Sequence, residues 1–165
     1  MEIPVKKLLV LGLITVGLAS CSSNDPAAPT DEELTHLLLN GTWQGACLEA
    51  GALSFKVEHI YNNGTGSTSL NEYANGTCIG TPVSTPKDFT YTFGADVTVD
   101  GTVAGITEAQ EINLVFSDAA FSDEYNIFAI KDLISLYTGV VTGTTPETRP
   151  AQLFEPSLLT LVTTK

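Results

Sequence analysis

The feature that most limits how this chain can fold is a strict alternation of side chains with a period of two. From Leu53 to Tyr61 the odd-numbered residues are apolar or aromatic, and the same pattern recurs from Phe89 to Phe93. This period is that of a β-strand with one dry and one wet face. Asn62-Asn63-Gly64 and Asp100-Gly101 are typical of the turns that join such strands into hairpins. The pattern therefore predicts antiparallel sheet.

About nine short segments of this kind follow one another from Thr42 to Thr163, and such spacing favours an all-β sandwich or barrel. Closing the sheet removes its exposed edges. We therefore expect an all-β fold, a single antiparallel up-and-down β-barrel of about eight strands. A short helix should precede it, capped by Thr30 or Asp31 and ended by Asn40-Gly41, with His36 on its solvent side.

The N-terminal segment predicts export. Lys6 and Lys7 precede an apolar run from Leu8 to Leu18, which at about eleven residues is too short to span a bilayer. Leu18-Ala19-Ser20-Cys21 resembles the bacterial lipoprotein box, which implies cleavage before Cys21 and acylation of its thiol. The alternative is an ordinary signal with a chance cysteine.

The resemblance to lipoproteins divides the chain into a signal peptide over 1–20, an acylated cysteine with a flexible tether over 21–30 and a barrel domain over 31–165. Several acyl chains on one residue are sufficient for stable membrane attachment. Ser22 at the second mature position resembles the class sorted to the outer membrane. The expected location is thus the cell envelope, at the outer membrane facing the periplasm.

Two cysteines remain in the exported part, Cys47 and Cys78, and an even number in an oxidising compartment suggests a disulfide. The alternative is a metal site that these cysteines form with His36 and His59. The spacing lacks the short Cys-x-x-Cys or His-x-x-x-His pairs of such sites, so the disulfide is preferred.

The chain is strongly acidic. It carries 19 Asp and Glu against 7 Lys and Arg, a formal net charge of −12 at pH 7. Such a surface repels nucleic acid and anionic headgroups, so we expect neither as a partner.

A family resemblance rests on Leu39, Gly41-Thr42-Trp43 and Cys47, on Tyr73, Cys78 and Pro82, and on Thr107-Glu108-Ala109. Leu136-Tyr137-Thr138-Gly139 and Arg149-Pro150-Ala151-Gln152-Leu153 extend it. The pattern is similar to the lipocalin-like domain of the adenomatosis-polyposis-coli down-regulated family, although Asn75 stands where that family would have Asp. The resemblance implies an eight-stranded barrel and a Cys47–Cys78 bridge. It also implies that Arg149 covers Trp43, the alternative being a plain loop charge.

No pattern in the sequence indicates catalysis or a cofactor, so we expect neither, nor a metal ion. A cavity that suits an apolar ligand with one polar contact would be lined by Phe55, Val57, His59, Phe89, Tyr91 and Phe93. These side chains could equally fill the barrel, because eight strands leave little room inside. The first hypothesis is a membrane-anchored lipoprotein that binds or shuttles a small apolar ligand. The alternative is a structural or assembly lipoprotein with a packed barrel and a protein partner.

Overall fold

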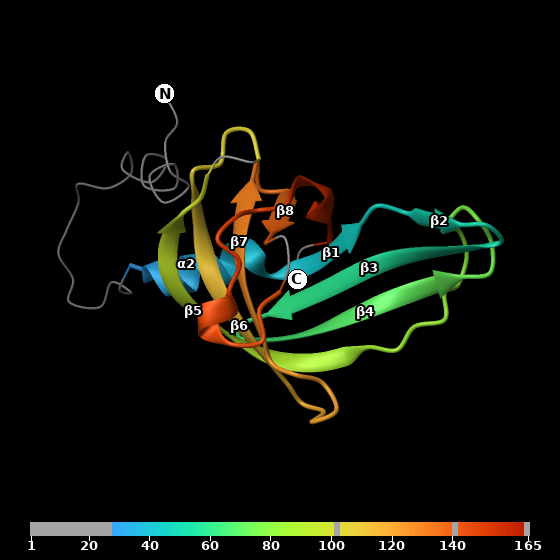
Figure 1. The fold of residues 1–165 in the computed structure, drawn as a ribbon, viewed down its shortest axis with the longest axis horizontal. Helices are drawn as coiled ribbons and strands as arrows, with labels where there is room; N and C mark the ends of the chain where they lie inside the picture. Colours follow the sequence, from blue (N-terminus) through green and yellow to red (C-terminus); the bar gives the residue numbers. More distant parts are fainter. Residues whose placement is uncertain (1–27, 101–102, 140–141, 164–165) are drawn as a thin grey trace, which may run out of the picture.

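Eight antiparallel strands close into a β-barrel, which confirms the expected fold class. The structure is a computed structural model that describes residues 28–100, 103–139 and 142–163. The strands are β1 (Gly41–Gly45), β2 (Leu48–Ala50), β3 (Leu53–Asn62), β4 (Thr65–Tyr73), β5 (Lys87–Thr98), β6 (Glu108–Phe116), β7 (Glu124–Lys131), β8 (Ser135–Thr138) and β9 (Leu159–Thr163). Their order is β1-β9-β8-β7-β6-β5-β4-β3, and the β1–β3 pairing closes the ring (Figure 1). The ninth strand, β2, adds to β3 outside it.

Helix α2 (Asp31–Leu39) packs against one end of the barrel. Thr30 accepts from the Glu33 backbone N–H, and Glu33 accepts from the Thr30 backbone N–H, so both ends of a capping box are present. The buried residues of the helix are Thr35 and Leu39, whereas Leu37 is 65% exposed. His36 is also not on the solvent side as expected. Its Nδ1 lies 3.1 Å from the Tyr91 hydroxyl, which ties the helix to β5.

Aromatic side chains fill the barrel interior. The Trp43 indole N–H donates to the Leu39 carbonyl at 2.7 Å, which satisfies its polar atom within the core. Ring centroids lie 5.4 Å apart between Tyr61 and Tyr91 and 5.9 Å apart between Phe89 and Phe116. The core comprises Leu39, Trp43, Tyr61, Phe89, Tyr91, Ile112, Leu114, Phe116, Phe128, Ile130, Leu136 and Leu159. The centre of this barrel is therefore packed.

A second apolar cluster lies on the outside of the barrel wall. The β5–β6 register shifts between Phe93 and Asp96, so the alternation along β5 changes phase there. Val97 and Val99 consequently pack with Ile127 on the outer surface. Leu153, from the long connection between β8 and β9, covers this cluster and bridges to Gly139.

The same connection holds Arg149 against the outer face of β6 and β7. Its guanidinium donates to the carbonyls of Ile112 at 3.1 Å and Asn126 at 2.9 Å, and its Nε lies 3.2 Å from a Glu111 carboxylate oxygen. Its aromatic contact is Tyr125, whose ring centroid is 5.6 Å away. The prediction that Arg149 covers Trp43 is therefore wrong, because the two side chains lie on opposite sides of the barrel wall. Arg149 instead fastens the long connection to the barrel.

The first of the predicted strand segments, which begins at Thr42, is divided into two strands, β1 and β2. β1 pairs with β9 and with the C-terminal half of β3, whereas β2 pairs with the N-terminal end of β3. Ala46 and Cys47 lie between β1 and β2. Cys47 is joined to Cys78 by a disulfide with an S–S distance of 2.04 Å, as predicted. The two sulfur atoms are bonded to each other, so they are not metal ligands in this structure.

Candidate functional site

The β3–β4 hairpin continues past the end of the barrel opposite α2, together with β2 (Figure 1). β4 pairs with β3 along its whole length, from Thr65 to Tyr73, but its pairing with β5 covers Thr65–Thr68. Beyond Thr68, β4 and β5 therefore diverge. The three strands form a projecting sheet, one face of which continues the inner surface of the barrel.

That inner face is apolar and exposed. Tyr61 belongs to the core, and the residues two, four, six and eight positions before it share its side of the strand. Cross-strand pairing adds Leu48 opposite Phe55 and Leu70 opposite Val57. Leu48 is 59% and Leu70 is 55% exposed. The surface is called the open face from here on, and it comprises Leu48, Leu53, Phe55, Val57 and Leu70.

The other face of the projecting sheet is polar and covered. The Ser54 hydroxyl is buried, donates to the Asn75 carbonyl at 2.6 Å and accepts from the Cys78 N–H at 2.8 Å. Val83 forms a backbone bridge to Glu72 at the edge of β4. These bonds and the disulfide hold the sheet from one side, so the open face is a fixed wall of the site.

A pocket of about 610 Å³ opens where the barrel meets this wall. Val57 and Leu70 belong both to the pocket and to the open face. Phe116 and Phe121, whose ring centroids are 5.9 Å apart, form the apolar part on the barrel side. The remaining lining residues are Thr68, Ser69, Thr85, Lys87, Ser122, Asp123, Glu124, Thr142, Gly143 and Thr144. The pocket therefore combines two apolar pairs, Val57 with Leu70 and Phe116 with Phe121, with a lining that is otherwise mostly polar.

Three charged side chains stand at this mouth. Lys87 Nζ lies 4.0 Å from the Phe121 ring centroid, in a cation–π contact. Burial raises the pKa of Glu124, and Lys87 opposes that shift. Asp123 is its neighbour in the pocket lining. The mouth thus holds one ammonium and two carboxylates.

His59 lies between the pocket and the core. It pairs with Thr68, which lines the pocket, and its ring stacks on Tyr61 with centroids 6.1 Å apart. Its ring is partly exposed, but Nδ1 is buried and has no hydrogen-bond partner among the described residues. Burial lowers the pKa of His59 from 6.5 to about 4, so the imidazole is neutral at pH 7.

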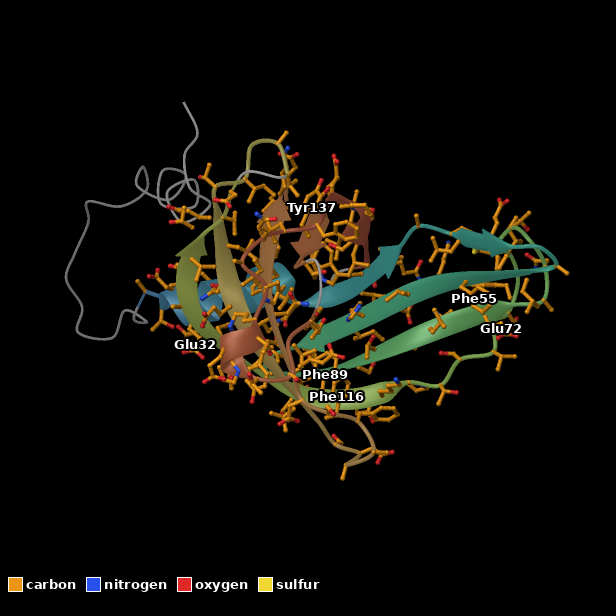
Figure 2. The ribbon with its side chains drawn as sticks, viewed as in Figure 1. Glu32, Phe55, Glu72, Phe89, Phe116 and Tyr137 are labelled. Carbon is orange, nitrogen blue, oxygen red and sulfur yellow. A yellow bond between two sulfur atoms is a disulfide. The ribbon has the colours of Figure 1, made fainter. Side chains whose placement is uncertain are left out.

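The residues predicted to line a cavity fall into two groups. Val57 lines the pocket, and Phe55 lies on the open face of the projecting sheet (Figure 2). His59 lies two residues beyond Val57 along β3, where β4 still pairs with β5. Phe89 and Tyr91 are buried in the packed core, and Phe93 packs against it, so the prediction that all six surround one cavity is wrong. Alternation identifies the face of a strand, but it does not locate where the barrel ends.

The pocket residues that come from loops could not be identified from the sequence. Leu70 is the one aliphatic residue in β4, and that is a usable signal. Phe121, from the β6–β7 connection, and Glu124, at the start of β7, meet Thr144, from the β8–β9 connection, only through tertiary packing. No group of three potential metal ligands forms within 28–100, 103–139 and 142–163.

No protein-family model matches the chain, and no curated protein matches it. None of the helices in the described part of the chain is long and apolar enough to cross a membrane.

Proposed function

We propose that this chain is a lipid-anchored envelope protein that binds a small apolar or amphiphilic ligand at the mouth of its barrel. The observation that carries the proposal is the continuity between the 610 Å³ pocket and the exposed open face, which share Val57 and Leu70. Ligand sites are typically concave and combine apolar surface with polar groups that orient the ligand. Here Val57, Leu70 and the two phenylalanines supply the apolar surface, and the other lining residues are mostly polar.

The energy available for binding comes from apolar surface that the fold leaves in water. Leu48, Leu53 and Leu70 are 59%, 37% and 55% exposed. Full burial of such a side chain contributes about 1.5–3 kcal/mol, so covering these three contributes roughly 2–4 kcal/mol before the cost of ordering the ligand. Because the core aromatics occupy the barrel centre, the ligand lies at the mouth and along the open face.

The anchor and the location rest on the sequence. Cys21 and the lipoprotein-like box lie outside the described residues. The eight-stranded barrel and the Cys47–Cys78 bridge agree with what the resemblance to the lipocalin-like domain implies. Replacing Cys21 with Ala should release the protein from the membrane fraction. Retention there would contradict the lipoprotein assignment.

A second candidate is an assembly lipoprotein whose open face docks onto a protein. The packed interior and the exposed leucines both favour it, since contiguous apolar patches on soluble domains commonly mark interfaces.

Native mass spectrometry separates the two candidates. A chain from Ser22 to Lys165 keeps every strand and both apolar clusters, and it would be purified from a periplasm. We expect a native mass above the denatured mass, with the excess extractable into organic solvent. Leu70→Asp should lose the excess mass. Val115→Asp, a similarly exposed site on the outer face of β6, should keep it. A bare polypeptide mass, unchanged after incubation with envelope lipids, would favour the protein partner.

A further inference from the structure

We propose that the ligand is a cationic amphiphile, with an ammonium group in the mouth beside Asp123 and Glu124 and an alkyl chain along the open face. This inference rests on the proposed function and adds the chemical class of the ligand.

The first argument is the balance of charge around the site. Asp123 and Glu124 line the pocket. Glu72 pairs with Phe55 across β3 and β4, so it stands beside the open face on the same side of the sheet (Figure 2). Against these three carboxylates stands one ammonium, Lys87. The whole chain adds to the field with a formal net charge of −12. A mouth with a net negative charge attracts cations and repels anionic headgroups.

The second argument is that the mouth already stabilises an ammonium. Lys87 Nζ sits 4.0 Å above the Phe121 ring, and its charge acts on Glu124. An aromatic face combined with a carboxylate is the environment that proteins use to bind alkylammonium groups. Lys87 is exposed, so its flexible side chain can leave this position when a ligand ammonium enters.

The third argument is that the positive charge of Lys87 does not fully offset the effect of burial on the Glu124 carboxyl group. Its carboxyl is partly buried, and burial raises its pKa despite the proximity of Lys87. A second cation in the pocket would stabilise the ionised form and oppose this shift, as Lys87 does.

The apolar part of the ligand follows from the shape of the open face. From Val57 to Leu53 the strand advances about 13 Å, at roughly 3.3 Å per residue, and Phe55 lies between them. Leu48 and Leu70 flank this row on the neighbouring strands. A linear alkyl chain fits such a strip and begins where the pocket ends.

The test uses three probes with the same dodecyl chain: dodecylammonium, dodecanol and dodecyl sulfate, each below its micelle concentration. Each would displace the uncharged fluorophore N-phenyl-1-naphthylamine from the Ser22–Lys165 chain. We expect dodecylammonium to displace it at a concentration roughly tenfold lower than dodecanol, and dodecyl sulfate at a higher one than either. High salt should reduce the differences between the displacing concentrations of the three probes, because it screens the charges.

Removing the carboxylates and removing the ammonium group at the mouth should change dodecylammonium affinity in opposite directions. The double variant Asp123→Asn, Glu124→Gln should weaken dodecylammonium binding roughly tenfold more than it weakens dodecanol binding. Lys87→Met should strengthen dodecylammonium binding, because it removes a competing cation. Glu108→Gln removes an exposed carboxylate at the start of β6, away from the pocket lining, and as the control should change neither.

Equal or tighter displacement by dodecyl sulfate would overturn the inference, as would weaker dodecylammonium binding by Lys87→Met. In either case the fluorophore still binds, so the proposed function survives. Failure of the fluorophore itself to bind the wild-type chain, with no displacement by any probe, would remove the proposed function and the inference together.

Discussion

Replacing His59 with Phe should change how the stability of the domain depends on pH. His59 is neutral in the fold because burial lowers its pKa from 6.5 to about 4. In the unfolded chain the imidazole returns to its ordinary pKa and binds a proton more readily. The unfolded state therefore gains protons first as the pH falls, and the fold loses stability between pH 6.5 and pH 4.

The magnitude follows from the size of the shift. One pKa unit corresponds to 1.36 kcal/mol, so a shift from 6.5 to about 4 amounts to at most roughly 3 kcal/mol. The ring of His59 is partly exposed, and solvent screening reduces this to about 2 kcal/mol. The loss is absent above pH 6.5 and complete near pH 4.

The assay is urea unfolding followed by the fluorescence of Trp43, the one tryptophan in the chain. Wild type and His59→Phe would be compared from pH 7.5 to pH 4. Carboxylates, including Glu124 with its raised pKa, titrate in both proteins and cancel to first order in the difference. We expect the wild type to lose about 2 kcal/mol relative to the variant over this range.

The neutral-pH comparison adds a second check. His59→Phe removes a buried nitrogen that has no partner among the described residues and keeps an aromatic ring against Tyr61. At pH 7.5 the variant should therefore be as stable as wild type or more stable, by about 1 kcal/mol. A stability difference that stays constant from pH 7.5 to pH 4 would refute the argument, because the imidazole would then titrate alike in both states.

Three further predictions concern the framework that holds the site. Arg149→Met should lower the free energy of unfolding by about 2–4 kcal/mol in urea titrations, because it leaves a carboxylate and two carbonyls without their donor; an unchanged midpoint would contradict this. The double variant Cys47→Ser, Cys78→Ser should lose about 3–4 kcal/mol by the same assay, whereas thiol labelling of the oxidised native protein should modify neither cysteine. Gly66→Ala should cost about 1–3 kcal/mol in thermal or urea unfolding, since its Cβ would meet the Ile60 backbone carbonyl and lie 2.6 Å from the Phe89 ring; an unchanged stability would contradict this.

The sequence was sufficient for much of the local structure. The alternation from Leu53 to Tyr61 corresponds to β3, and Asn63 and Gly64 adopt the positive φ angles of 45° and 85° that their turn requires. Thr30 caps α2 as expected. These features depend on neighbours close in the chain, which is why local pattern is enough to predict them.

Packing decided the details that local pattern does not encode. The register shift in β5 after Phe93 turns Val97 outward, and nothing in the alternation of its side chains announces it. The position of Arg149 depends on how the long connection folds back over β6 and β7. A loop with three prolines has many routes, and only the complementary acceptors on the barrel wall select one.

The sequence by itself therefore determined the class of fold, the strand faces and the pairing of Cys47 with Cys78, because period, turn chemistry and cysteine number are written locally. Only the tertiary structure decided that the barrel centre is packed and that the open face lies at one end of the barrel. The pocket joins Val57, Leu70, Phe121 and Thr144, which belong to segments distant along the chain. Their proximity depends on where β4 leaves β5, a long-range property of the closed sheet that no window of sequence contains.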